Sequence, residues 1–182
     1  MLNLLSRKKN LRKYFKKISV KRNVPFTYDQ FEFVQINTGT HRLHLDILEY
    51  DHKEKIPTIV FMPGTNAYSM LYNEFLTQLR DNGFNVIGFD PRGHGRSDGK
   101  RGSYTIAELL EDMDAVVAYA RQHFGSKIYL AGSSQGGITA FYYAAKPYQN
   151  IRGAICHNAA ELTGEDSLHL TRNPTFSRYL KP

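Results

Sequence analysis

Apolar and polar residues alternate along two segments near the start of the chain, residues 31–36 and residues 43–50. A period of two is typical of strands that bury one face and expose the other to water. Asn37, Thr38 and Gly39 lie between the two segments, and their side chains favour a turn. The pattern therefore predicts a pair of half-buried antiparallel strands.

Further along the chain, continuous apolar runs replace this alternation. Such runs are typical of strands that are covered on both faces, as in a parallel sheet. We expect these buried strands at four places, which are residues 57–62, 85–89, 128–131 and 151–155. The body of the protein thus begins with a hairpin and continues as a buried sheet.

Segments with helical periodicity separate the apolar runs. Residues 68–80 have one apolar face, which is formed by Leu71, Phe75, Leu76 and Leu79. Residues 105–124 begin with Thr105 and Glu108 at the spacing of a capping box, and Gly125 follows the last turn. A third, apolar helix follows the run at 128–131. This alternation predicts an α/β fold with a mostly parallel sheet, helices on both faces and an antiparallel N-terminal edge.

Composition narrows the class of protein. The chain has 182 residues, of which 41% are hydrophobic and 23% charged, as expected for one globular domain. A single cysteine, Cys156, excludes an internal disulfide, and its apolar surroundings predict a packed, inert thiol. No apolar run approaches the roughly 18 residues of a membrane-spanning helix. The histidines are scattered without ligand spacing, so we expect no metal and no cofactor.

The net charge of +7 is concentrated at the N-terminus, where residues 1–25 carry nine basic side chains and no acidic one. The rest of the chain has 15 basic and 17 acidic side chains, a balance of −2, which argues against a nucleic-acid-binding domain. Residues 1–24 also contain a helical apolar stripe, formed by Leu4, Leu11, Phe15 and Ile18. Such a helix can lie on an anionic membrane with its stripe in the lipid. The alternatives are a solvated tail or a helix packed on the domain.

These patterns divide the chain into three parts. Residues 1–25 form the basic N-terminal segment, residues 26–160 form the α/β domain, and residues 161–182 form a polar tail with the composition of the start of a cap. The N-terminal segment does not look like a cleaved signal peptide, because its apolar part is short and its charges follow that part. We expect a cytoplasmic protein, with peripheral membrane contact through residues 1–24 as one alternative.

The pentapeptide Gly132-Ser133-Ser134-Gln135-Gly136 connects a predicted strand to a predicted helix. This is the G-x-S-x-G pattern of a nucleophile elbow, in which a strained turn presents a serine above the sheet. Polar loops also follow the other apolar strands, at residues 63–66, 90–99 and 157–160. Because carboxyl ends of parallel strands meet at one edge, we expect these loops and Ser134 to form a site there.

The segments IVFMPG, FDPRGHGRSDG and GSSQGG, in this order, resemble the α/β-hydrolase family over residues 31–160. Within it, the chain is similar to serine hydrolases related to monoacylglycerol lipases and serine aminopeptidases. The resemblance implies that Ser134 is the nucleophile and that the backbone amides of Thr65 and Gln135 form the oxyanion hole. It also implies a bracing loop, whose matching residues are Asp90, Arg92, His94 and the glycines on either side of His94. Pro63 departs from the family, where many members have a histidine at this position.

The resemblance implies an acid and a histidine on loops after later strands, but no downstream residue matches them. The acidic residues and the histidine beyond residue 160 are Glu161, Glu165, Asp166 and His169, and we expect solvated loop positions for them. The predicted fold is therefore incomplete at the C-terminus. The expected function is hydrolysis of acyl esters, completed by a missing C-terminal part or a second chain. The alternatives are an inactive truncated or split hydrolase and a peptidase or amidase of the same fold.

Overall fold

The structure is a computed structural model that describes residues 2–50, 56–147 and 149–158, with side chains from residue 10 onward. The helical elements in chain order are α1 (Leu2–Arg22), the 3₁₀ turns η1 (Tyr28–Gln30) and η2 (Ser69–Tyr72), α2 (Asn73–Asp81), α3 (Ile106–Phe124) and α4 (Gln135–Ala145). The strands are β1 (Glu32–Asn37), β2 (Arg42–Leu48), β3 (Thr58–Met62), β4 (Asn85–Asp90), β5 (Ile128–Ser133) and β6 (Ala154–His157).

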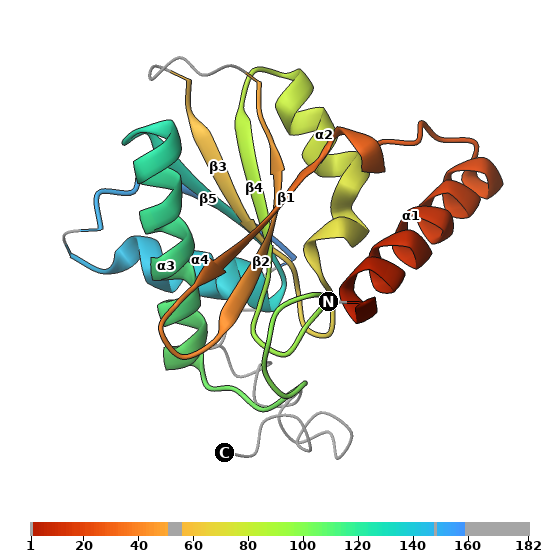
Figure 1. Ribbon diagram of the computed structural model, residues 1–182. Helices are drawn as coiled ribbons and strands as arrows, with labels where there is room; N and C mark the ends of the chain where they lie inside the picture. Colours follow the sequence, from red (N-terminus) through yellow and green to blue (C-terminus); the bar gives the residue numbers. More distant parts are fainter. Residues whose placement is uncertain (1, 51–55, 148, 159–182) are drawn as a thin grey trace.

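The six described strands form one sheet in the order β1-β2-β4-β3-β5-β6 (Figure 1). β1 and β2 pair antiparallel, and β2 also pairs antiparallel with β4. The remaining neighbours, β4 with β3, β3 with β5 and β5 with β6, are parallel. The expected α/β-hydrolase sheet, with its antiparallel N-terminal edge and a parallel remainder, is confirmed.

Helices pack on both faces of this sheet (Figure 1). On one face, α3 and α4 bury side chains such as Met113 and Tyr143 against Leu45 and Ile87. On the other face, α2 and α1 pack against a second cluster, whose buried members are Phe15, Tyr28, Phe31, Leu48, Ile59, Phe61, Met70, Leu76, Val86 and Ala131. The two clusters place the core on either side of the central strands.

Two predictions about strand burial were wrong. The segment 43–50 was expected to be half-buried, but every residue of β2 after Arg42 is buried, because β2 lies inside the sheet with packed clusters on both faces. The strand expected at 151–155 begins at Ala154 and is the last described strand at its side of the sheet, with Ile155 56% exposed. Cys156 is likewise exposed rather than packed, although its thiol donates a hydrogen bond to the Gly137 carbonyl at 3.1 Å.

The helix expected at 68–80 is divided in two, with η2 preceding α2. Of its expected apolar face, Leu76 is fully buried, but Leu71 and Phe75 are 47% and 42% exposed. The capping box of α3 is confirmed, since Thr105 and Glu108 each bond to the backbone amide of the other. Across the part of the chain that the structure describes, no helix has the length and apolar character needed to span a bilayer.

Candidate active site

Ser134 stands on a sharp turn between the end of β5 and the start of α4. Its backbone has φ 50° and ψ −119°, a conformation that is rare for any residue except glycine and that marks stored strain. Ser134 is exposed, whereas its neighbour Ser133 is buried. The turn therefore lifts the Ser134 hydroxyl, and not that of Ser133, out of the sheet.

Glycine is required next to this turn because α4 begins very close to the end of β3. A Cβ added to Gly136 would lie 2.1 Å from the Met62 carbonyl oxygen and 2.5 Å from that of Pro63. Any side chain at Gly136 would push α4 away from the sheet and move Ser134 with it. The second glycine of the motif is thus explained by packing in the described structure.

Thr65 and Gln135, the expected oxyanion donors, lie close to Ser134 and to each other. A Cβ added to Gly64 would lie only 3.3 Å from the Ser134 Cβ, and the Thr65 hydroxyl is 3.4 Å from the Gln135 side-chain oxygen. Within the described residues, no acceptor is recorded for the backbone N–H of Thr65 or Gln135. The Gln135 amide also begins α4, where the helix dipole favours negative charge. The structure thus brings these three residues together.

Asp90 lies beneath the loop that follows β4 and does not reach Ser134. Its buried carboxylate accepts hydrogen bonds from the backbone amides of Ser69 and Arg96, each at 2.8 Å. Gly95 crosses directly above it, since an added Cβ there would lie 2.0 Å from the Asp90 carboxylate, and Gly95 has φ 53°. Burial raises the pKa of Asp90 to about 6, with the nearby Asp46 adding to the rise. Asp90 therefore ties two loops together at the base of the site.

Arg92 contacts α3 and makes no hydrogen bond or ion pair with Ser134 within the described structure. Its guanidinium forms ion pairs with Asp112 at 2.7 Å and with Glu108 at 2.8 Å, both on α3. Asp112 is fully buried and also contacts the His41 ring nitrogen at 2.9 Å. Arg92 thus anchors the loop to α3.

His94 is buried beside the elbow, but no contact with Ser134 is recorded. Its Nδ1 is 3.0 Å from the Arg92 carbonyl, and its ring packs edge-on against Tyr104 at 5.5 Å. The Tyr104 hydroxyl donates to the Gln135 side chain at 3.1 Å, which links the loop to the elbow. Burial lowers the pKa of His94, so the ring is neutral near pH 7. This link through Tyr104 was not predicted from the sequence, because Tyr104 and Gln135 are 31 positions apart and meet only in the folded chain.

A buried polar cluster at the base of the loop was not predicted from the sequence. The Asp46 carboxylate on β2 forms an ion pair with the Arg96 guanidinium at 2.5 Å and lies 3.0 Å from Nε2 of His44. It also accepts a hydrogen bond from the Ser69 hydroxyl. Burial raises the pKa of Asp46 to about 7, although Arg96 opposes the rise. A signal existed, because residues 44 and 46 are two apart on a strand and share one face. Polar residues in an alternating strand predict solvent exposure, and for His44 and Asp46 this prediction was wrong.

A base for Ser134 is not found among the described residues. Its hydroxyl has no recorded hydrogen-bond partner there, and His157 contributes only its carbonyl, which accepts the Ser134 N–H at 2.8 Å. The four downstream candidates, Glu161, Glu165, Asp166 and His169, lie outside the described part of the chain. No cluster of three or more His, Cys, Asp or Glu in the described ranges is placed to hold a metal ion.

An apolar cavity of about 300 Å³ opens beside the elbow, between β3, α2 and the end of the sheet that carries β6. Its lining residues are Phe61, Tyr72, Phe75, Ala131, Gly132, Ser133, Ile155 and His157. Two of its walls, Phe75 and Ile155, are among the exposed hydrophobic residues noted above. The described structure therefore leaves apolar surface uncovered close to Ser134.

This fold and site define an α/β hydrolase. Residues 53–177 match the Hydrolase_4 family, described as serine aminopeptidase, S33, and the chain belongs to this family. Family membership establishes a hydrolase-type chain, and it leaves the substrate open.

Individual relatives agree with this placement. A proline iminopeptidase of Saccharolobus solfataricus is 41% identical over 83 residues, which are 44% of this chain and 26% of the relative. The structure of Est1E from Butyrivibrio proteoclasticus with bound ferulic acid matches with a TM-score of 0.61 and 29% identity, over 66% of this chain and 50% of that one. The hydrolase GrgF from Penicillium sp. sh18 shares the fold at a TM-score of 0.64 and 21% identity, over 81% and 54%.

The matches cover only part of each relative. The chain spans 36% of a putative non-heme haloperoxidase of Mycobacterium phage D29, which is 32% identical over 103 residues, and about half of the two solved structures above. The activity of a whole relative is therefore not carried over to this chain.

Proposed function

We propose that this chain carries the nucleophile half of a serine hydrolase that acts on carboxylic esters with aliphatic acyl groups. The Ser134 oxygen attacks the ester carbonyl, the alcohol leaves with a proton, and water later releases the acid from the acyl-enzyme. The backbone N–H groups of Thr65 and Gln135 stabilise the oxyanion of both steps. No metal or cofactor takes part in this scheme.

One observation carries the proposal: Ser134 is an exposed, strained serine with two unsatisfied backbone donors beside it. An ordinary glycine-rich turn needs neither a positive φ at serine nor a neighbouring strand loop packed against it. The loop at residues 90–99 also supports the oxyanion hole. His94 of this loop packs against the Tyr104 ring, and the Tyr104 hydroxyl in turn binds the Gln135 side chain. Est1E, to which the chain is similar, binds ferulic acid.

The proposed reaction also needs a general base, because a serine hydroxyl is a weak nucleophile at neutral pH. We assign the base and its acid partner to a C-terminal part beyond these 182 residues or to a second chain, because the relatives are much longer than this chain and no residue after the elbow matches the family's acid and histidine. Without them, the oxyanion hole and binding alone leave roughly 10³–10⁴ of acceleration over water. We therefore expect the 182-residue chain by itself to hydrolyse esters very slowly.

Active-site labelling tests the nucleophile. A fluorophosphonate probe should label the chain slowly, and Ser134→Ala should remove the label while Ser133→Ala retains most of it. The matched control is informative because the two serines are adjacent and only Ser134 is exposed. Labelling that survives Ser134→Ala, or that depends on Ser133, would overturn the assignment.

An aminopeptidase is the second candidate, and its support is the family description together with the 41% identity to a proline iminopeptidase. Hydrolysis of p-nitrophenyl butyrate should exceed that of proline p-nitroanilide if the ester proposal holds. The reverse order would favour the peptidase. A chain that neither labels at Ser134 nor cleaves either substrate, even when supplied with the C-terminal part of a relative, would be an inactive remnant of the fold.

A further inference from the structure

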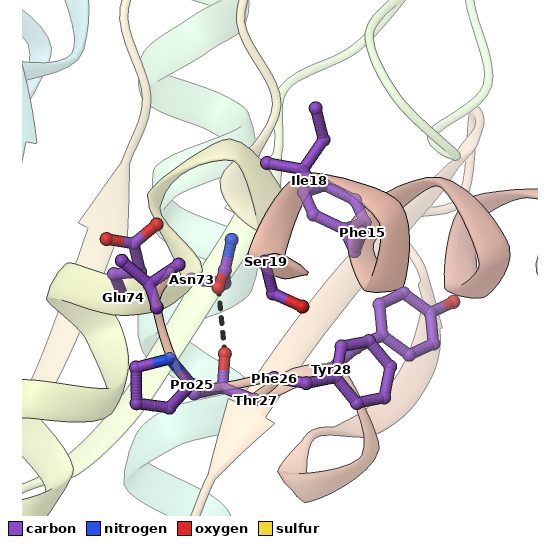
Figure 2. Close-up of a pocket in the computed structure, with 10 residues that line it drawn as sticks. Phe15, Ile18, Ser19, Pro25, Phe26, Thr27, Tyr28, Asn73 and Glu74 are labelled. Carbon is purple, nitrogen blue, oxygen red and sulfur yellow. Dashed lines mark hydrogen bonds between the residues drawn. The ribbon is translucent and has the colours of Figure 1, made fainter. Parts of the chain in front are cut away.

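The inner face of α1 is packed onto the domain. Phe15 is buried, and its ring lies 5.9 Å from that of Tyr28, while Ser19 is buried beside it (Figure 2). The cavity left between α1, residues 24–28 and the start of α2 is about 10 Å³, barely the space of one water molecule. The described part of the apolar stripe, from Leu11 to Ile18, is therefore used in packing, and the sequence-based alternative in which it enters lipid does not fit the fold.

Two ion pairs hold the flanks of the helix in place. Arg12 pairs with Asp29 through two hydrogen bonds, at 2.5 and 2.7 Å, and Arg22 pairs with Glu74 at 2.6 Å. These arginines face acidic residues of the body. One ion pair near each end of the described side chains of α1 therefore keeps the same side of the helix facing the domain.

The outer face of α1 has a different character. Lys13, Lys17 and Lys21 are exposed, and no ion-pair partner is recorded for them among the described residues. Val20 lies one turn from Lys17 along the same side of the helix and is 76% exposed, more than any other large hydrophobic side chain in the described residues. Helical spacing places residues 13, 17, 20 and 21 on the side opposite Phe15. We call these four residues the outer ridge.

We propose that the outer ridge docks the protein on an anionic lipid surface. The three ammonium groups lie at the level of the lipid phosphates and carboxylates, and Val20 enters the boundary between headgroups and acyl chains. An exposed valine amid lysines fits an interface with an apolar layer, whereas a nucleic acid backbone offers it no partner. The proposal does not depend on the chemistry of Ser134.

Vesicle flotation tests the charge requirement. The full chain should bind vesicles of 70% phosphatidylcholine and 30% phosphatidylserine, and it should bind pure phosphatidylcholine at least tenfold more weakly. Each basic residue near such a surface strengthens binding about fivefold, so Lys13→Gln with Lys17→Gln should weaken binding about 25-fold. The matched control, Lys100→Gln with Lys146→Gln, removes the same charge elsewhere and should leave binding within about twofold.

Equal losses in the two double variants would show that only net charge matters and would overturn the docking face. Equal binding to both vesicle types would exclude the electrostatic part of the proposal. A short DNA duplex that binds as tightly as the anionic vesicles would show a general polyanion surface and overturn the lipid assignment. Circular dichroism of each variant verifies that it is folded.

Fluorescence tests which side of the helix meets the lipid, because the chain contains no tryptophan. A Val20→Trp variant should shift its emission to the blue on anionic vesicles and be quenched by brominated lipids. A Phe15→Trp variant should show neither change. Quenching at position 15 would mean that α1 leaves the domain and inserts its stripe, and absence of quenching at position 20 would remove the ridge from the interface. Either result would overturn the proposal.

Discussion

The two sides of the sheet differ in how fully the described chain covers them. On the side of β2 and β4, which we call the closed side, Leu43, Leu45 and Phe89 are completely buried and packed clusters lie on both faces. On the side of β5 and β6, the open side, Ile155 is mostly exposed and a cavity of about 300 Å³ lies beside the elbow. One sheet thus combines a complete core with an uncovered edge.

The difference separates two tasks. The closed side holds the buried carboxylates Asp46 and Asp90, which fix the bracing loop through Arg96 and Ser69. The open side carries Ser134, the proposed nucleophile, whose hydroxyl must be exposed to reach a substrate. Rigid support therefore comes from the part of the fold that is fully packed, and access comes from the part that is not. Substitutions on the two sides should have unequal effects on the free energy of unfolding.

The largest expected contrast is between two matched aliphatic truncations. Leu45→Ala on the closed side should lower the free energy of unfolding by about 2–5 kcal/mol, because it opens a cavity in a fully packed cluster. Ile155→Ala on the open side should cost less than about 1 kcal/mol, because the side chain is already exposed. Urea denaturation of both variants measures the difference. Similar costs would show that β6 is as well packed as β2.

Two glycine-to-alanine substitutions on the open side test whether close packing of α4 against β3 positions the elbow. Gly136→Ala should cost about 1–3 kcal/mol and reduce fluorophosphonate labelling, because the new methyl group would collide with the Met62 carbonyl. The control, Gly153→Ala, places its methyl group 3.4 Å from the Tyr129 ring and should change stability by less than about 0.5 kcal/mol. If both variants behave alike, the close approach of α4 to β3 is not what positions Ser134.

The pH dependence of stability should identify Asp46 on the closed side. Burial raises its pKa from 3.8 to about 7, so the folded state binds this proton more tightly than the unfolded state between these values. The associated stability is complete below about pH 4 and is lost as the pH rises through 7. The stability of the wild type relative to Asp46→Asn should therefore decline from pH 5 to pH 8, as measured by urea midpoints.

Asp81→Asn is the control for this titration, because the Asp81 side chain is mostly exposed on α2. A decline that appears only in the Asp46→Asn comparison would report the buried carboxyl group. A difference for Asp46→Asn that is also constant, or that grows as the pH rises, would contradict a raised pKa in the folded state.

The smallest expected effect concerns the cap of α3, a helix that packs across the central strands in the same cluster as Leu45. Thr105→Ala removes the side-chain oxygen that accepts the Glu108 amide, and it should cost about 1 kcal/mol in thermal or urea unfolding. Thr105→Ser keeps this oxygen and should recover most of the loss. A serine variant as unstable as the alanine variant would assign the effect to the threonine methyl group instead.

Local patterns determined much of the fold. The switch from alternating to continuous apolar runs predicted the hairpin and the parallel strands, because side-chain period and burial are linked within each strand. The capping box of Thr105 and Glu108 was predictable because both partners lie within one turn. The elbow was predictable for the same reason, since its glycines and Ser134 are contiguous and their spacing reflects the backbone geometry itself.

Only the tertiary structure decided the burial of β2 and the role of α1. His44 and Asp46 look like solvent-facing residues until Arg96, fifty positions away from Asp46, supplies the opposite charge inside the fold. The stripe around Phe15 suits lipid and protein equally well, because an apolar face does not specify its partner. Its pairing with Tyr28 and the ion pairs of Arg12 and Arg22 settle the matter through contacts between segments distant in the sequence. The sequence by itself thus determined the elements and the elbow, whose interactions are local, whereas long-range contacts decided which polar and apolar faces became buried.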